Sequence, residues 1–383
     1  MKKLKNYLSI LLLTALAFAS CKQPSVSGSN SHPTKTPSGL PAGLTFIEVK
    51  TDDHVTSFIN QGGVKSTAET GVFFTNLYKS SYPELEVGPL TPPWAGCSAF
   101  LISDGNGGYY AGRNFDWSYY SDAVIIRDRP SNGDYASVCT FNKMFVTYGG
   151  NFSTLPLKDQ KKIVAETGLF VPVDGFNEKG LCVFVLNQET GPNINLTDEN
   201  TEKPDVTLTS AVRLLLNKTK TVDEAVALLK KYDMHSDISL AHHLFIADAN
   251  GKSVAVEWDN NSTDTSKHGM KVTETKVLAN HPVYKATPEY GFTEAQLKAD
   301  YPNSMERFNA IKNKIASKKN KASFDDAKEI IHSSHQDATR WTIVYHITKD
   351  YSEETFYWAG KNGQWKTTSD NWTKAKGYVV SAR

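Results

Sequence analysis

Cysteine is scarce in this chain, and so are long basic tracts and long apolar runs. Only four of the 383 residues are Cys, too few for a disulfide-rich scaffold, so each one is a candidate for chemistry. The formal net charge is +1, and no basic stretch follows the N-terminus, which argues against a nucleic-acid-binding protein. A content of 39% apolar and 22% charged residues is typical of a globular protein. The length allows two domains or one large domain.

The N-terminus has the features of a secretory signal. Three lysines in the first five residues precede an apolar stretch, residues 7–19, which is too short to span a bilayer of ~30 Å. Small residues then lead to Cys21, as in the lipobox of bacterial lipoproteins, which this segment resembles. We therefore expect residues 1–20 to be a lipoprotein signal peptide and Cys21 to be lipidated. The alternative is an ordinary cleaved signal followed by Cys.

The segment after Cys21 has a composition that does not favour folding. Residues 22–40 are rich in Ser, Pro, Thr and Lys and have almost no large apolar side chains, so they cannot bury enough surface to fold. We predict that residues 21–43 are a flexible tether. The lipid at Cys21 would hold the protein at a membrane of the bacterial cell envelope, facing the periplasm or the exterior.

Further along the chain, strand patterns and helical patterns come in blocks. Alternating patterns with turn signals predict strands, whereas apolar residues at helical spacing predict helices. The expected strands are 44–49, 98–103, 108–113, 123–127, 243–248, 252–258, 341–347 and 354–358. The expected helices are patches within 55–77, then 207–218, 221–232, 304–318 and 323–333. Such blocks favour segregated layers, an α+β fold, over a βαβ alternation.

One hairpin is set apart by what precedes it. Pro92 and Pro93 make the approach to Cys97 stiff and non-helical. A strand begins at Cys97, a glycine-rich turn follows at 104–108, and the return strand carries Gly-Arg-Asn-Phe-Asp, with Arg113 and Asp116 at sixteen and nineteen positions after Cys97. The sequence thus presents a cysteine opposite an arginine and an aspartate.

This segment resembles the choloylglycine hydrolase and acid ceramidase group of N-terminal-nucleophile hydrolases, the linear amide C–N hydrolases. Three later segments also resemble segments of this family and follow in the same order. They are Asn177-Glu-Lys-Gly-Leu181 with Asn187, Leu278-Ala-Asn280, and the Arg307-Phe308 pair in a helix. The resemblance implies an αββα sandwich, two antiparallel sheets between helical layers. It also implies a pro-segment or small subunit at 44–96 and a catalytic domain at 97–383.

The chemistry of such a site explains the residue types. A thiol with an ordinary pKa near 8.5 needs a base or a cation to become a thiolate. If the bond between Gly96 and Cys97 is cut, the freed α-amine, with a pKa of ~7.7–8.0, can take the proton from its own thiol. Arg113 would favour the thiolate, and Asp116 would accept hydrogen bonds from the amine. No cofactor is expected.

The resemblance also assigns further roles. Asn187 and Asn280 would line an oxyanion hole, and Arg307 would support the site electrostatically. Cys97 itself would cut the chain by attacking the carbonyl of Gly96, a residue with no side chain to obstruct the strained geometry.

Each candidate has a structural alternative. Cys97 could be a buried packing residue, Asn187 and Asn280 could be turn residues, and Arg307 could be a helix-surface cation. Cys139 and Cys182 are interpreted as packing residues or as one disulfide. His332 and His335 have a spacing that zinc sites use, but no third ligand is evident, so no metal site is predicted.

The hypothesis is therefore a lipid-anchored, self-cleaving cysteine amidase. Its partner would be a small-molecule acyl amide with a hydrophobic acyl group, of the fatty-acyl amide, conjugated bile acid or penicillin V type. An acyltransferase of the isopenicillin N type and a non-catalytic binding lipoprotein remain as alternatives. The oligomeric state and the substrate are left open by the sequence.

Overall fold

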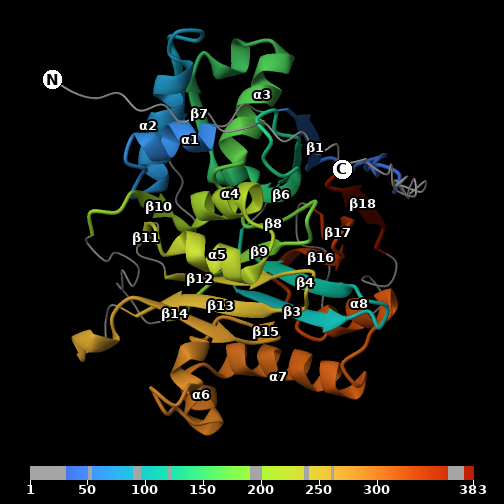
Figure 1. Ribbon diagram of the computed structural model, residues 1–383. Helices are drawn as coiled ribbons and strands as arrows, with labels where there is room; N and C mark the ends of the chain where they lie inside the picture. Colours follow the sequence, from blue (N-terminus) through green and yellow to red (C-terminus); the bar gives the residue numbers. More distant parts are fainter. Residues whose placement is uncertain are drawn as a thin grey trace, which may run out of the picture. The chain divides into compact units, whose positions relative to one another are not determined.

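The protein is described here by a computed structural model. It describes residues 32–50, 54–88, 96–119, 122–189, 201–236, 241–259, 263–360 and 375–383, and the chain divides into two units, 1–33 and 34–383. The second unit contains every helix and strand discussed below (Figure 1). The signal peptide and the lipidation site predicted at Cys21 lie outside the described residues. Within those residues, no helix combines the length and the apolar character that crossing a membrane requires.

The larger sheet has eight strands. All neighbours are antiparallel except the first pair, which is parallel. The order is β1 (Leu44–Val49), β5 (Ala123–Asp128), β6 (Ser137–Asn142), β8 (Asp174–Asn177), β9 (Cys182–Asn187), β12 (His242–Ala247), β13 (Ser253–Trp258) and β14 (Met270–Glu274). The central strands are buried along their whole length, as expected for a sheet covered on both faces.

The second sheet has six strands and is antiparallel throughout. Its order is β15 (Val277–Leu278), β3 (Cys97–Ser103), β4 (Tyr109–Asp116), β16 (Thr339–Ile347), β17 (Ser352–Trp358) and β18 (Gly377–Ser381). The predicted hairpin at Cys97 is the β3–β4 pair, in the interior of this sheet. Alternate side chains of β3 face opposite sides: Cys97, Ala99 and Leu101 belong to the main core, whereas Phe100 and Ile102 belong to a second cluster with the helices.

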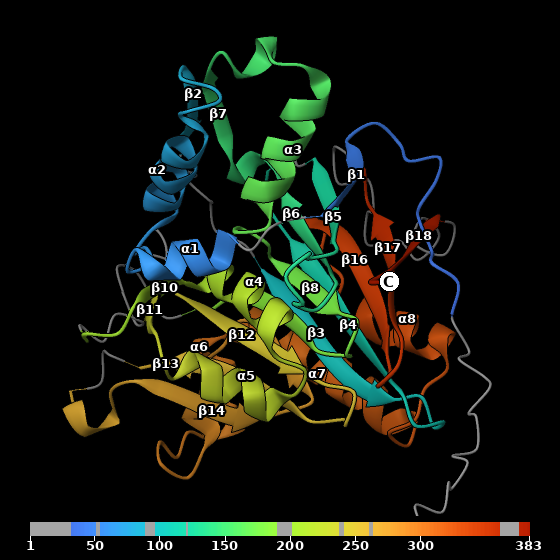
Figure 2. The same ribbon diagram turned by 45° about the horizontal axis from the view of Figure 1, so that its top comes forward.

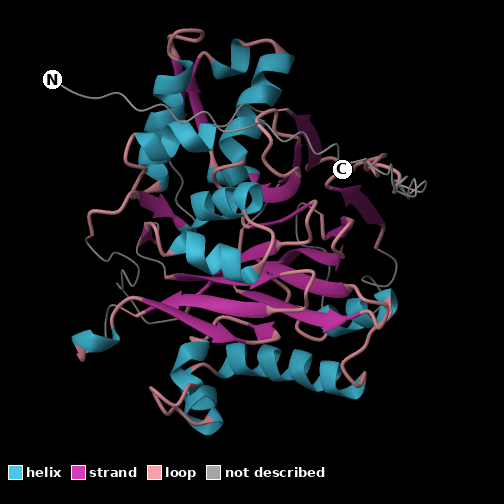
Figure 3. Cartoon of the chain, viewed as in Figure 1, coloured by secondary structure: helices cyan, strands magenta, loops and turns pink. Residues whose placement is uncertain are grey.

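Helices cover the outer faces of both sheets (Figures 1 and 3). On the larger sheet lie α3 (Leu157–Gly168), α4 (Leu208–Lys218) and α5 (Val222–Leu229). The six-stranded sheet is covered by α7 (Pro302–Ser317) and α8 (Phe324–His332), and α6 (Glu294–Asp300) packs on α7. The α+β class and the αββα layering predicted from the sequence are confirmed.

Residues 34–50 and 54–88, which precede Cys97, belong to the same unit as the two sheets (Figure 2). Strand β1 is an edge of the larger sheet, and β2 (Leu85–Gly88) pairs with β7 (Thr147–Gly150). The helices here are α1 (His54–Asn60) and α2 (Thr67–Tyr78). A two-stranded sheet, β10 (Asp205–Thr207) with β11 (Asp233–His235), and the short helices η1 (Lys143–Phe145), η2 (Phe152–Thr154), η3 (Thr265–Lys267) and η4 (Val283–Ala286) complete the described elements.

Some predictions need correction. The tether is predicted to extend to residue 43. The second unit begins at Thr34, and the Lys35 backbone exchanges hydrogen bonds with Ser381. The final strand, β18, was not expected. The disulfide alternative for Cys139 and Cys182 is wrong, because both are free and buried.

Candidate active site

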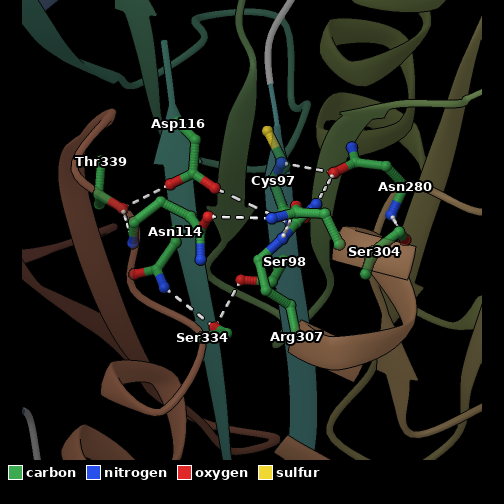
Figure 4. A network of polar contacts seen from close by, with 12 residues as sticks. Cys97, Ser98, Asn114, Asp116, Asn280, Ser304, Arg307, Ser334 and Thr339 are labelled. Atoms are coloured by element: carbon green, nitrogen blue, oxygen red, sulfur yellow. Dashed lines mark hydrogen bonds and ion pairs between the residues drawn. The ribbon is translucent and has the colours of Figure 1, made fainter. Parts of the chain in front are cut away.

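Cys97 is the first residue of β3 and lies between the two sheets. It pairs with Phe115 of β4, and only 2% of its surface is exposed. Figure 4 shows Cys97 between Asp116 on one side and Asn280 on the other. The bond from Gly96 to Cys97 is intact, so this geometry is that of the uncut chain.

The guanidinium of Arg113 lies beside the sulfur. Its Nη2 donates to Cys97 Sγ at 3.4 Å and to the backbone oxygen of Val185 at 3.1 Å. The guanidinium carbon also lies 4.9 Å from the centre of the Phe115 ring, a distance at which a cation and an aromatic face attract each other. The cation expected next to Cys97 is therefore present, and its guanidinium contacts Cys97, Val185 and Phe115.

A carboxylate that the sequence analysis missed completes this arrangement. Asp174 of β8 accepts a charge-assisted hydrogen bond from Arg113 Nη1, and both side chains are fully buried. Trp341 Nε1 donates to the same carboxylate oxygen at 3.3 Å. The sequence did contain a signal for this residue, an Asp directly after the apolar residues 171–173. A charged residue in a buried strand requires a partner.

Asp116 contacts the cleavage site from the end of β4. Its backbone N–H donates to the Gly96 carbonyl oxygen at 3.0 Å, and one carboxylate oxygen accepts from Thr339 Oγ1. The other, Oδ2, is buried without a hydrogen-bond partner and would lie 3.3 Å from a Cβ atom on residue 96. An acceptor without a hydrogen bond therefore faces the bond between Gly96 and Cys97.

Asn280 contacts the nitrogen of Cys97, which is a different arrangement from the one we expected. Its Oδ1 accepts from Cys97 N at 3.0 Å, and its Nδ2 donates to the backbone oxygen of Asn187 at 2.6 Å. In the uncut chain one of its two amide hydrogens is thus already used in a hydrogen bond. The Asn187 side chain is buried, and its Nδ2 and Oδ1 both lack a hydrogen-bond partner.

Arg307 of α7 contacts three of the residues just described. Its guanidinium donates to the backbone oxygen of Cys97 and to Asn280 Oδ1, and it lies 3.9 Å from Asp116 Oδ2. Asn303, one turn earlier on α7, accepts from Arg307 Nε at 3.0 Å. The alternative of a helix-surface cation does not hold, because Arg307 is only 3% exposed.

Ser98 and Asn114, which alternate with the site residues of the hairpin, face α8 and the residues just after it, and they hold the hairpin against this helix (Figure 4). Asn114 Nδ2 donates to the Ile331 backbone oxygen at 2.9 Å and to Ser334 Oγ at 3.1 Å. Ser98 and Ser334 also share a hydrogen bond of 2.7 Å. Because strand residues alternate between faces, Asn114 anchors β4 to the helix while Arg113 faces Cys97.

Burial dominates the electrostatics of the site. It raises the pKa of the Cys97 thiol above the ordinary value; Arg113 opposes this rise and Asp116 adds to it. Burial also raises the pKa of Asp116, against the positive charge of Arg307 and the hydrogen bond from Thr339. In the uncut chain the thiol is therefore mostly protonated at neutral pH, and a base is needed to generate the thiolate.

One group of described side chains has the proximity required for a metal ion. Asp205, Asp233 and His235 have ligand atoms within 4.8 Å of one another, on β10 and β11. His332 and His335 are adjacent, with ring centroids 5.5 Å apart, but belong to no such group among the residues that the structure describes.

Known proteins with a similar sequence or fold were found for this chain. A family model described as linear amide C–N hydrolases, choloylglycine hydrolase family, matches residues 97–292, more than half of the chain. Among solved structures, penicillin V acylase from Agrobacterium tumefaciens is similar at 17% identity, with a TM-score of 0.47, over 69% of this chain and 83% of that one. A mutant conjugated bile acid hydrolase from Clostridium perfringens gives 17% identity and a TM-score of 0.47, over 67% of this chain and 88% of that one. No curated protein matches.

Proposed function

The chain belongs to the choloylglycine hydrolase family of linear amide C–N hydrolases, and from this premise we propose that it is a self-cleaving cysteine amidase. Cys97 is the proposed nucleophile. The proposed substrates are linear amides with a hydrophobic acyl group, of the fatty-acyl amide, conjugated bile acid or penicillin V type. The observation that carries this proposal is the contact of one thiol with a guanidinium, next to a peptide bond whose oxygen and nitrogen are both hydrogen-bonded.

In the proposed maturation, the sulfur attacks the carbonyl carbon of Gly96. Negative charge would develop on the Gly96 oxygen, which already accepts from the Asp116 backbone N–H at 3.0 Å; such a donor stabilises the tetrahedral intermediate. The bond from carbon to the Cys97 nitrogen then breaks, and that nitrogen takes a proton and leaves as an amine. Water hydrolyses the thioester, giving a carboxylate on Gly96 and a free N-terminal Cys97.

In the proposed amidase reaction, the new amine takes the proton of its own thiol. Asp116 Oδ2 and Asn280 Oδ1, which lie close to the cut bond, are the acceptors that would orient the amine. The thiolate attacks the amide carbon, and Asn187, whose amide is uncommitted, is the proposed oxyanion donor. The carbon–nitrogen bond breaks, the leaving amine receives the proton, and water hydrolyses the acyl-thioester.

Burial of Cys97 in the uncut chain fits this order of events. A thiol that is 2% exposed can reach the neighbouring carbonyl but not an external amide. Cutting the chain would free Gly96 to move away from Asp116 and open a path to the sulfur. The proposal therefore requires that self-cleavage precede hydrolysis.

Intact-mass measurement on wild type and Cys97→Ala tests the proposal. Wild type should give two fragments, the larger beginning at Cys97, and should release free acid from at least one member of a panel of acyl amides. Cys97→Ala should give one uncut chain and no acid. An uncut wild-type chain that hydrolyses amides would contradict self-cleavage, and a fully cut chain inactive on the whole panel would contradict the amidase. New amide formed from added amines faster than free acid would instead indicate an acyltransferase.

A further inference from the structure

A buried histidine and glutamate lie next to the active-site turn. His243 of β12 and Glu257 of β13 are both fully buried. His243 Nδ1 lies 3.0 Å from Glu257 Oε1, and His243 Nε2 lies 2.8 Å from the backbone oxygen of Ala279. The imidazole therefore connects the larger sheet to the residue immediately before Asn280.

The partners of the ring determine how many protons it carries. A backbone oxygen can only accept, so Nε2 must donate to Ala279. The Glu257 carboxylate accepts from two backbone N–H groups, that of Val283 at 2.9 Å and that of Tyr284 at 2.9 Å, which favours its ionised form. An ionised carboxylate is an acceptor on both oxygens, so Nδ1 must donate as well.

These contacts hold the backbone on both sides of Asn280. His243 binds the carbonyl before Asn280, and Glu257 binds the N–H groups at the start of η4, just after it. Between them, Asn280 N donates to Ser304 Oγ at 2.8 Å, and the Asn280 side chain accepts from Cys97 N. A shift of this turn would therefore move the acceptor away from the nitrogen that the proposed cleavage frees.

We propose that His243 is a positioning residue for Asn280: a doubly protonated imidazolium, paired with Glu257, that holds the Asn280 turn against Cys97. This inference rests on the proposed function of Cys97 for its consequence in catalysis. The protonation of the ring itself does not depend on that function, because it follows from the acceptors around it.

Other charged and titratable groups face this pair. His281 donates its backbone N–H to Ser304, and burial, with the charges of His243 and Arg307, lowers its pKa to about 3, so it is neutral. Glu189 also faces His243 and Arg307, both of which lower its pKa, although burial raises it overall. Arg307 is a cation that acts on both Glu189 and His281. Glu257 is thus the carboxylate that directly binds the imidazole.

Nitrogen-15 NMR of the full chain labelled at histidine tests the proton count. His243→Gln identifies the His243 signals by their disappearance. We expect two ring nitrogens that each carry a bonded proton at neutral pH. A ring with a single proton would overturn the inference, because it would place the shared proton on Glu257. This measurement needs no activity, so it stands even if the amidase proposal fails.

Three variants test the positioning role. His243→Gln and Glu257→Gln should each slow self-cleavage and amide hydrolysis by about tenfold or more, the range found when a partner that orients a functional ligand is lost. His346→Gln is the matched control and should retain wild-type rates. It also removes an imidazole bound to a carboxylate, because His346 Nε2 lies 3.0 Å from Asp104 Oδ2.

The split between kcat and KM separates positioning from a general loss of structure. Because the Asn280 turn acts on the nitrogen of Cys97, folded Glu257→Gln should lower kcat more than it changes KM. Unchanged rates in both folded variants would overturn the inference while leaving the amidase proposal intact. If His243→Gln does not fold, the positioning role is tested by Glu257→Gln and by the NMR measurement on wild type. A wild-type chain that neither cuts itself nor hydrolyses amides would overturn the function instead.

Discussion

At the residue scale, the environment of Cys97 depends on a buried ion pair. Arg113 reaches the sulfur from the neighbouring strand, and its position is set by Asp174 across the sandwich. A buried charge that loses its partner is strongly destabilising, because the remaining charge has no water to replace the lost contact. The same pair should therefore control both stability and reactivity.

Asp174→Asn should show the effect on stability. The change removes the negative charge that balances Arg113, so we expect a loss of about 3 to 5 kcal/mol in the free energy of unfolding. Urea unfolding in a Cys97→Ala background, which keeps a single chain, measures this. Arg383→Gln breaks an exposed ion pair with Glu178, typically worth about 0 to 1 kcal/mol, and serves as control. Equal stability losses in the two variants would contradict the importance of the buried pair.

Self-cleavage should depend on pH through the thiol. Because burial raises the pKa of Cys97 and the thiolate is the reactive form, the rate should rise with pH, by about tenfold per unit below that pKa. The rate can be followed by intact mass after a pH jump of uncut chain. Arg113 lowers the thiol pKa, so Arg113→Met should move the profile to higher pH. A rate independent of pH from about 6 to 9 would contradict a rate-determining thiolate.

At the scale of elements, the segment before Cys97 is part of the fold. Strand β1 pairs with β5 over its full length, and the Glu48 carboxylate of β1 binds Arg127 of β5 and Arg129, which directly follows that strand. In α2, the ring of Phe74 lies 5.1 Å from that of Phe170. These contacts would join the two fragments after a cut at Gly96, so we expect the upstream fragment to stay bound.

Phe74→Ala tests this retention. The side chain is fully buried, and removing a buried Phe ring typically costs about 3 to 5 kcal/mol. Gel filtration of cleaved protein in increasing urea should show wild-type fragments eluting together, with the variant's fragments separating at lower urea. Val72→Ala, on the same helix but 58% exposed in wild type, should behave as wild type. Separation of the wild-type fragments without urea would contradict retention.

At the scale of the whole molecule, retention of the upstream fragment would determine the proposed location of the enzyme. If the upstream fragment carries a lipid at Cys21 and stays bound, the catalytic fragment is anchored without any covalent link to the membrane. The proposed anchor is the lipid at Cys21, in which each buried methylene contributes about 0.8 kcal/mol.

Cys21→Ser should therefore release the enzyme. In cells, we expect wild-type amidase activity in the membrane fraction and the activity of Cys21→Ser in the soluble fraction, with equal self-cleavage in both. Cys139→Ser, which changes a free buried cysteine outside the proposed anchor, should leave the activity with the membranes. Membrane-bound activity in Cys21→Ser would show that the anchor lies elsewhere.

Much of the site could be predicted because it is local in the sequence. Cys97, Arg113 and Asp116 lie on the two strands of one hairpin, so strand alternation and a short turn suffice to bring them together. Arg307 was identified by family resemblance, and the structure places it at Cys97. The layering also followed from the pattern, since blocks of strands and helices each need an apolar face to cover.

The remaining features were decided by the tertiary structure. Asp174, His243 and Glu257 sit in strands whose patterns show only burial, and their partners come from other strands and from the Asn280 turn. The hydrogen bonds between Lys35 and Ser381 join the start of the second unit to β18, a strand more than 340 residues later. The sequence by itself determined which residues share a hairpin and which faces are apolar, because these depend on short-range geometry. Which buried charges meet depends on the pairing of distant strands, and only the folded chain specifies that pairing.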